Sequence, residues 1–281
     1  MLTLVFAGGK APSGEVGQEV NQWLDENGQA YARAFSSGSL YWIHWRGVGV
    51  FAFTDDSLVV RVWPEPDSRQ EGVAYVFAML RPVILQALGW QALHAGAAVG
   101  PAGALAFCGR SSSGKSTLAF AMQQVGWRQF ADDALLLRLD PSCVAACPLP
   151  FTPRLRPASR AYFERVSLPP SPEPLSAEVP LTAVFLLQQD GSLNGPRVSL
   201  IPRSRAFSEV LPHAHCFDMV DPTHTRRLVE SYLGLAASVP VFKLEYGPDF
   251  QRLSHITSAV VETAASIDGG PVFSSELRRA V

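Results

Sequence analysis

The stretch from Ala104 to Val125 places an apolar segment, a glycine-containing loop and a helical pattern in direct succession. The loop reads Gly109-Arg-Ser-Ser-Ser-Gly-Lys-Ser-Thr117 and satisfies the pattern G-x-x-x-x-G-K-[ST] in full. Between a strand and a helix, the backbone N–H groups of such a loop and the helix N-terminus converge and bind phosphate. This feature predicts an α/β fold built around a phosphate-binding loop. The alternative, a chance Gly/Ser-rich turn, does not account for the flanking segments.

Positions within the loop have expected roles in binding a nucleoside triphosphate. Gly109 and Gly114 permit the tight backbone path. Lys115 is expected to bring positive charge to the β- and γ-phosphates, and the Ser116 hydroxyl to bind Mg²⁺. The chain has only three lysines, at positions 10, 115 and 243, so a lysine at the motif position of an arginine-rich chain is informative. The predicted cofactors are ATP and Mg²⁺, and the predicted nucleotide-binding residues are Gly109, Arg110, Ser111, Ser112, Ser113, Gly114, Lys115, Ser116 and Thr117.

Two adjacent carboxylates, Asp132 and Asp133, follow a short apolar segment after the loop. Phosphoryl transfer uses such groups, because one carboxylate can hold Mg²⁺ while another orients and deprotonates the attacking hydroxyl. A solvated turn with two acids is the alternative. The preceding phosphate loop favours the functional interpretation.

The segment from Ala92 to Leu139, which joins Leu-His94-Ala-Gly-Ala-Ala-Val, the loop and Gly-Trp-Arg-Gln-Phe-Ala-Asp132-Asp133, resembles the catalytic core of the HPr kinase/phosphorylase family. The resemblance implies an HPr-kinase/PEP-carboxykinase-like core with a mixed sheet flanked by helices. It implies that Asp133 is the base for a serine hydroxyl and that Asp132, with Ser116, is a metal ligand. It makes His94 a polar member of the site, the alternative being a buried histidine satisfied by backbone.

The sequence departs from that family after the aspartates, where no segment resembles the glycine-rich signature of the bifunctional enzymes. Phosphorylase activity and HPr as substrate are therefore not expected. The segment 151–157, Phe-Thr-Pro-Arg-Leu-Arg-Pro, resembles instead the Pro-Arg-Leu-Arg stretch of HPr-kinase-like proteins of peptide modification, including lasso-peptide kinases, which phosphorylate a serine at the end of a precursor peptide. Arg154 and Arg156 are candidates to neutralise developing phosphate charge or to bind a carboxylate. The alternative is ordinary exposed arginines in a proline-rich loop.

The acceptor is expected to be a serine of a peptide or protein. Two alternatives remain open: a kinase of a small metabolite such as free serine, and a non-catalytic regulator that binds nucleotide. Preference among ATP, GTP and pyrophosphate is also open. A homo-oligomer is suggested by analogy with the family's hexamers.

The pattern of apolar segments predicts two domains. Residues 1–68 are expected to form a small α+β accessory domain, and 69–281 the P-loop catalytic domain. In the first, we expect a strand at the start, a helix over 15–27, and strands near 40–44, 49–53 and 58–63. In the second, we expect helices over 73–93, 115–125, 221–237 and 248–266, and strands over 94–99, 104–107, 134–139, 181–187 and 239–244.

Composition excludes some classes of partner. The formal net charge is -2 with 23 basic and 25 acidic residues, so broad electrostatic binding to nucleic acid or to an anionic membrane is not expected. The four cysteines are irregularly spaced. In a chain of this size they fit free thiols in a reducing compartment, and the predicted location is the cytoplasm.

Overall fold

The computed structural model describes residues 2–140, 143–166, 177–218 and 220–267. Contacts divide the chain into two compact units. Unit 1 comprises Met1–Trp90 with His215–Leu228, and unit 2 comprises Gln91–Ala214 with Val229–Val281. Within the described part of the chain, no helix is long and apolar enough to cross a membrane. Each unit is a sheet with helices, so the mixed α/β class predicted from the sequence is confirmed.

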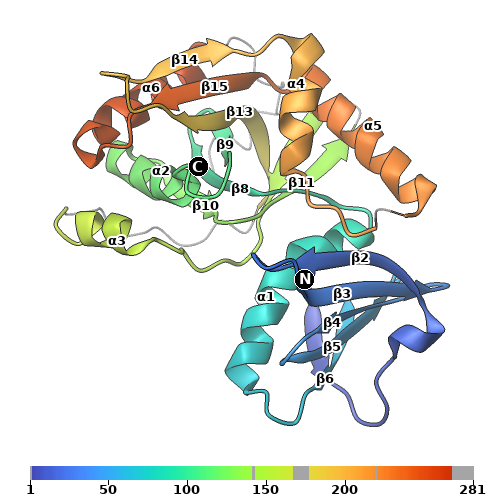
Figure 1. Cartoon of the computed structure of the whole chain (residues 1–281). Coiled ribbons are helices and arrows are strands. Elements are labelled where there is room, and N and C mark those ends of the chain that lie inside the picture. The colour runs from blue at the N-terminus through green and yellow to red at the C-terminus, as the bar shows by residue number, and fades with distance from the viewer. Residues whose placement is uncertain (1, 141–142, 167–176, 219, 268–281) are drawn as a thin grey trace. The chain divides into compact units, whose positions relative to one another are not determined.

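Unit 1 contains a six-stranded sheet in the order β1-β6-β5-β4-β3-β2 (Figure 1). All neighbouring strands are antiparallel except β1 and β6, which are parallel. Its core is aromatic, with Trp42, Phe51 and Phe53 almost fully buried, because alternate residues of a strand point to one face. The strands are β1 (Thr3–Phe6), β2 (Gln18–Leu24), β3 (Ala30–Ser37), β4 (Leu40–Trp45), β5 (Gly49–Thr54) and β6 (Val59–Pro64), with a 3-10 turn η1 at Gly14–Val16.

The helix predicted over 15–27 is wrong, because this segment forms β2. Its backbone pairs with β3, which the sequence analysis did not predict. The Asn21 side chain also donates hydrogen bonds of 2.9 Å to the carbonyl oxygens of Cys216 and Phe217. Val20 and Trp23 are three residues apart, a spacing that also fits one face of a helix. The neighbouring strand decided the structure, as tertiary context does for short segments.

The boundary between the units lies at Trp90 and not near residue 68 as predicted. Helix α1 (Gln70–Ala87) belongs to unit 1, and Figure 1 shows it lying along the first sheet. Its Gln86 side chain accepts a 2.7 Å hydrogen bond from the backbone N–H of Phe217, which ties 215–228 to the same unit. The predicted helix over 73–93 therefore ends early, and Gln91–Leu93 is strand β7 of unit 2.

Unit 2 has a mixed sheet whose main path runs β10-β8-β9-β13-β12-β11-β7. Strand β15 pairs parallel to β13 and antiparallel to β14. The strands are β8 (Ala95–Gly100), β9 (Gly103–Cys108), β10 (Arg128–Ala131), β11 (Leu135–Asp140), β12 (Cys143–Cys147), β13 (Val179–Gln189), β14 (Arg197–Leu200) and β15 (Val241–Tyr246). The predicted hairpin of 94–99 with 104–107 is confirmed by the antiparallel pairing of β8 and β9.

The other helices range from 7 residues in α2 and α3 to 17 in α5. They are α2 (Lys115–Ala121), α3 (Pro157–Phe163), α4 (Arg203–Val210), α5 (Pro222–Ser238) and α6 (Leu253–Ala265), with 3-10 turns η2 (Met122–Val125), η3 (Leu211–His213) and η4 (Phe250–Arg252). Helices α2 and α6 pack on each other and on one face of the sheet.

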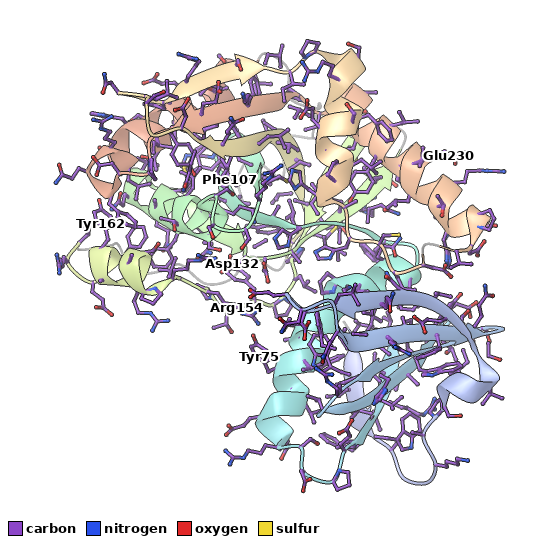
Figure 2. The ribbon with its side chains drawn as sticks, in the orientation of Figure 1. Tyr75, Phe107, Asp132, Arg154, Tyr162 and Glu230 are labelled. Carbon is purple, nitrogen blue, oxygen red and sulfur yellow. The ribbon has the colours of Figure 1, made fainter. Side chains whose placement is uncertain are left out.

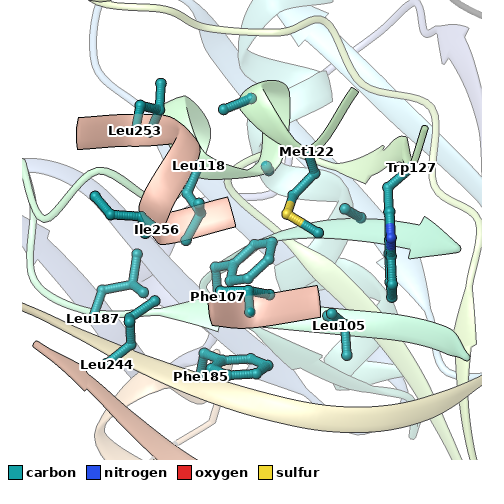
Figure 3. Close-up of a cluster of buried hydrophobic side chains, with 14 of the residues drawn as sticks. Leu105, Phe107, Leu118, Met122, Trp127, Phe185, Leu187, Leu244, Leu253 and Ile256 are labelled. Carbon is teal, nitrogen blue, oxygen red and sulfur yellow. The ribbon is translucent and has the colours of Figure 1, made fainter. Parts of the chain in front are cut away.

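The core beneath α2 and α6 positions the loop. Phe107 and Phe185 come from the adjacent parallel strands β9 and β13 and pack below Leu118 and Ile256 (Figure 3). Full burial of one such side chain contributes about 1.5–3 kcal/mol. Helix α2 comes close to β8 because Gly96 has no side chain, and a Cβ there would lie 3.1 Å from the Lys115 carbonyl oxygen.

Candidate functional site

The loop from Gly109 to Gly114 connects the carboxyl end of β9 to the first residue of α2. Its backbone enters the left-handed region at Gly109, Ser112 and Gly114, with φ of 153°, 69° and 94°. A Cβ on Gly109 would lie 2.5 Å from Ser113 Oγ, and one on Gly114 would lie 2.7 Å from the Tyr246 hydroxyl oxygen. Both glycines are therefore required by the backbone path, as the motif predicted.

Two side chains of the sheet donate hydrogen bonds to the loop and fix its position. The Tyr246 hydroxyl donates a hydrogen bond to the Ser113 carbonyl, and Gln189 Nε2 donates one of 3.2 Å to the Ser112 carbonyl. These residues face each other at the ends of the parallel strands β15 and β13. Burial raises the pKa of Tyr246 to about 12, so its hydroxyl stays a donor. The sequence analysis missed both residues, although each stands where an apolar strand ends, the usual place of ligand sites in α/β sheets.

Lys115 is 8% exposed, and its ammonium is folded onto the loop. Its Nζ donates to the carbonyl oxygens of Gly109 at 3.0 Å and Arg110 at 3.3 Å. Burial lowers the pKa of Lys115, while the carboxylate of Asp133 acts in the opposite direction. The ammonium therefore lies at the loop with the charge that a phosphate group needs.

Asp132 follows strand β10 and is buried, with 7% exposure. Its Oδ2 accepts a 2.6 Å hydrogen bond from the backbone N–H of Arg154, and its side chain is also hydrogen-bonded to Ser116. Burial raises the pKa of this carboxyl, and the two hydrogen bonds partly offset the rise. Its Oδ1 is buried and, within the described residues, has no hydrogen-bond partner. An unsatisfied carboxylate oxygen beside a hydroxyl offers the hard oxygen ligands that Mg²⁺ takes, so the pair fits that ion.

Asp133 occupies a different environment from its neighbour. Its side chain is 56% exposed, and its Oδ1 lies 3.6 Å from His94 Nδ1. Its Oδ2 lies 3.8 Å from an Arg154 guanidinium nitrogen. The residue has φ of 69°, a conformation that costs a non-glycine residue about 1–3 kcal/mol and that is concentrated at functional sites. The open carboxylate is accessible to a substrate hydroxyl, whereas that of Asp132 is turned inward.

His94 lies beside Asp133, as the resemblance implied. Burial lowers the pKa of His94, the charge of Lys115 lowers it further, and Asp133 opposes both. The neutral imidazole is therefore favoured. The backbone N–H of His94 donates a 2.7 Å hydrogen bond to the His213 carbonyl. Burial, with Lys115 and His94, also lowers the pKa of His213. His213 does not line the cavity described below, and the sequence analysis did not identify it as a neighbour of His94.

The segment 151–156 leads into α3 and brings two arginines to the loop. Arg154 contacts both aspartates, as described above, and Arg156 donates a 3.4 Å hydrogen bond to the Ser111 hydroxyl. Figure 2 shows Asp132 and Arg154 near each other in unit 2. The spacing along the sequence gave no distance between the arginines, which precede α3, and the aspartates, which follow β10.

A single cavity of about 430 Å³ collects most of the predicted residues. Among the predicted residues, Gly109, Arg110 and Ser113 do not line it. The predicted residues that line it are His94, Ser111, Ser112, Gly114, Lys115, Ser116, Thr117, Asp132, Asp133, Arg154 and Arg156. The lining residues that the sequence analysis did not identify are Leu118, Ala158, Ser159, Gln189, Tyr246, Gly247, Pro248, Asp249, Phe250, Leu253 and Ile256.

No protein-family model matches the chain, and no curated protein matches it. The structure of the Hpr(Ser) kinase/phosphatase from Coxiella burnetii is similar with a TM-score of 0.36 and 14% sequence identity, over 64% of this chain and 99% of that one.

Proposed function

We propose that unit 2 is a Mg²⁺-dependent phosphotransferase that moves the γ-phosphoryl group of ATP to a hydroxyl group. The observation that carries this proposal is the set of residues that line one cavity. Lys115 at the glycine loop, the oxygen pair of Ser116 and Asp132, and the open carboxylate of Asp133 all line it. These are the parts that phosphoryl transfer needs: a phosphate cradle, a metal site and a base.

Each of these parts has a distinct task. The backbone N–H groups of the loop and of the first turn of α2 bind the phosphates. The Lys115 ammonium moves from the loop carbonyls, 3.0 and 3.3 Å away, to the β- and γ-phosphate oxygens. Ser116 and Asp132 would hold Mg²⁺, which neutralises phosphate charge when bound. This arrangement leaves Asp133 facing the acceptor.

Asp133 is the base in this scheme. Its carboxylate takes the proton of the attacking hydroxyl while the bond from that oxygen to the γ-phosphorus forms and the bond from phosphorus to the β-phosphate oxygen breaks. ADP leaves with the electron pair of that bond. The neutral His94 and the guanidinium of Arg154, 3.6 and 3.8 Å from its two oxygens, orient the carboxylate. Arg154 and Arg156 also offer positive charge to the transferred group.

The acceptor that we propose is a serine of a peptide or protein, including a serine at a peptide C-terminus. Arg154, beside Asp133, and Arg156, beside Ser111, support this choice, since guanidinium groups bind carboxylates in pairs of hydrogen bonds. Free serine has the same hydroxyl and carboxylate, so it remains the second acceptor to be compared. A nucleotide-binding regulator is the non-enzymatic alternative that the experiment must separate from both.

The test uses γ-labelled ATP and Mg²⁺ with serine-terminated peptides, free serine and HPr as acceptors. Peptides ending in alanine serve as matched controls, because they keep the carboxylate and lack the hydroxyl. The wild-type protein is expected to label the serine peptides. Lys115→Ala is expected to lose triphosphate binding, and Asp133→Ala to keep it but lose transfer.

Three results would count against parts of this proposal. Transfer of the phosphoryl group by Asp133→Ala at the wild-type rate would show that Asp133 is not the base. Label on free serine alone would show that the acceptor is a small metabolite and not a peptide. Tight nucleotide binding with no labelled acceptor would favour the regulator.

A further inference from the structure

The cavity has a charged end and an apolar end. The charged end contains the groups described above around Lys115 and Asp133. The apolar end, as we use the term, is formed by Leu118, Ala158, Phe250, Leu253 and Ile256. Four elements contribute to it: α2, α3, η4 and α6.

Thr117 links the two sets of residues along the chain, between Ser116 of the charged end and Leu118 of the apolar end. It follows the predicted Mg²⁺ ligand Ser116 by one residue, and its hydroxyl is 2.8 Å from that of Ser159 on α3. Both residues line the cavity. This contact joins the first turn of α2 to α3, so the apolar end begins one helical step beyond the phosphate cradle.

The walls of the apolar end are held by their own packing. The ring of Phe250 stacks on Tyr162 of α3, with centroids 5.0 Å apart and planes 19° from parallel. Leu118, Leu253 and Ile256 belong to the hydrophobic core and are at most 5% exposed. A wall fixed in this way is already in place before a ligand arrives, and such pre-formed apolar surfaces are typical of small-molecule sites.

The chemistry of the apolar end suits a flat, uncharged group. Its five residues carry no charge, so a phosphate group there would lose hydration without gaining a cation. A nucleobase has an apolar face that stacks on aromatic rings. Its polar edge would find polar partners in Gly247 and Asp249, which also line the cavity.

We propose that the apolar end is the base subsite of the phosphate donor, and that Phe250 is a residue that selects nucleoside triphosphates over bare polyphosphate. The inference rests on the proposed function, because the position of the triphosphate at the loop sets where the base lies. It assigns the donor class that the sequence left open: a nucleotide and not pyrophosphate.

The test compares binding of ATP and of inorganic tripolyphosphate, each with Mg²⁺, by titration calorimetry. The two probes share a triphosphate and differ in the nucleoside. Wild type is expected to bind ATP at least about tenfold more tightly than tripolyphosphate, since stacking of one base on an aromatic side chain has an effect of that size. Phe250→Ala is expected to remove most of this preference and to leave tripolyphosphate binding within about twofold of wild type.

A second variant fills the subsite without touching the core. Ala158 is exposed and lines the cavity, so Ala158→Trp is expected to exclude the base while the protein stays folded. Ala161→Trp is the matched control, because Ala161 is exposed on the same helix and does not line the cavity. The control is expected to keep the ATP preference of wild type.

The outcomes separate the two proposals. Equal binding of ATP and tripolyphosphate by wild type, or a full ATP preference in both Phe250→Ala and Ala158→Trp, would overturn the base subsite while leaving the phosphate cradle intact. Failure of wild type to bind either probe would overturn the proposed function itself, and the base subsite with it.

Discussion

The backbone N–H of Arg154 donates a 2.6 Å hydrogen bond to the Oδ2 atom of Asp132, across 22 residues of chain. The guanidinium of the same residue lies 3.8 Å from Asp133. One residue thus supports the inward-facing aspartate through its backbone and the outward-facing aspartate through its side chain. The two functions can be separated, because a side-chain substitution leaves the backbone bond in place.

Arg154→Ala is expected to reduce phosphoryl transfer about 10- to 100-fold, because it removes positive charge beside the transferred group and keeps the hydrogen bond to Asp132. The Mg²⁺ concentration for half-maximal rate is expected to stay within about twofold of wild type. The measurement is the transfer rate as a function of Mg²⁺. Arg160→Ala, on exposed Arg160 of α3, is the control. An altered Mg²⁺ requirement in Arg154→Ala would contradict this separation.

The Mg²⁺ requirement is expected to depend on pH through Asp132. Burial raises the pKa of this carboxyl, so its proton competes with Mg²⁺ at a higher pH than for an ordinary aspartate, whose pKa is about 3.9. The Mg²⁺ affinity should therefore fall as the pH falls. The decrease should begin at a higher pH than it would for an exposed carboxylate ligand. Mg²⁺ titrations of ATP binding over a pH series check this, and a requirement that is flat down to pH 4.5 would contradict it.

The same pKa shift has a defined effect on stability without ligand. The folded protein binds the proton of Asp132 more readily than the unfolded chain does, because the folded pKa is raised. Acidification through the range between the two pKa values therefore adds stability from this group. Asp132→Asn is expected to remove that contribution, so the difference in unfolding free energy between variant and wild type should change across this range in urea titrations.

Gly114→Ala is expected to destabilise the protein more than Gly126→Ala. Both glycines have left-handed φ, of 94° and 83°. A Cβ at Gly114 would meet the Tyr246 hydroxyl at 2.7 Å, whereas one at Gly126 would meet nothing within 4 Å. Gly126→Ala should therefore lose only the conformational term, about 1–2 kcal/mol.

The double variant Gly114→Ala with Tyr246→Phe tests the steric part of this prediction. Without the hydroxyl, the nearest Tyr246 atom to the new Cβ is the ring carbon at 3.8 Å. Adding Tyr246→Phe is therefore expected to recover part of the lost stability, although it also removes the hydrogen bond to Ser113. Thermal unfolding of wild type, Gly114→Ala, Gly126→Ala and the double variant measures the conformational and the steric effect. A Gly114→Ala variant as stable as Gly126→Ala would show that the loop shifts to accommodate the added Cβ.

Lys115→Met is expected to separate stability from binding. Burial lowers the pKa of Lys115, which means that its charge is desolvated in the folded state. Methionine retains the aliphatic chain without the charge, so the melting temperature should stay the same or rise. Triphosphate affinity should fall about 10- to 100-fold with the loss of charge-assisted hydrogen bonds. Calorimetry and thermal unfolding on one preparation test both parts, and unchanged affinity would argue against the role of Lys115.

The sequence by itself determined the loop and its flanking elements. Residues 109–117 are contiguous, and their path depends on local properties: positive φ at Gly109 and Gly114, an apolar strand before them and a helix after them. The β8–β9 hairpin and the position of Asp132 after a strand were predictable for the same reason. At these positions the local pattern was sufficient to predict the local backbone.

Tertiary structure decided what the loop faces. Tyr246 and Gln189 reach the site only through the order of strands in the sheet, which sequence spacing does not contain. The environments of the two aspartates, one buried and one open, depend on the distant segment around Arg154. Strand β2 was misread as a helix because its backbone partner, β3, decided its conformation. Contacts between distant residues are set by how elements pack, since packing satisfies the backbone and buries the apolar faces together.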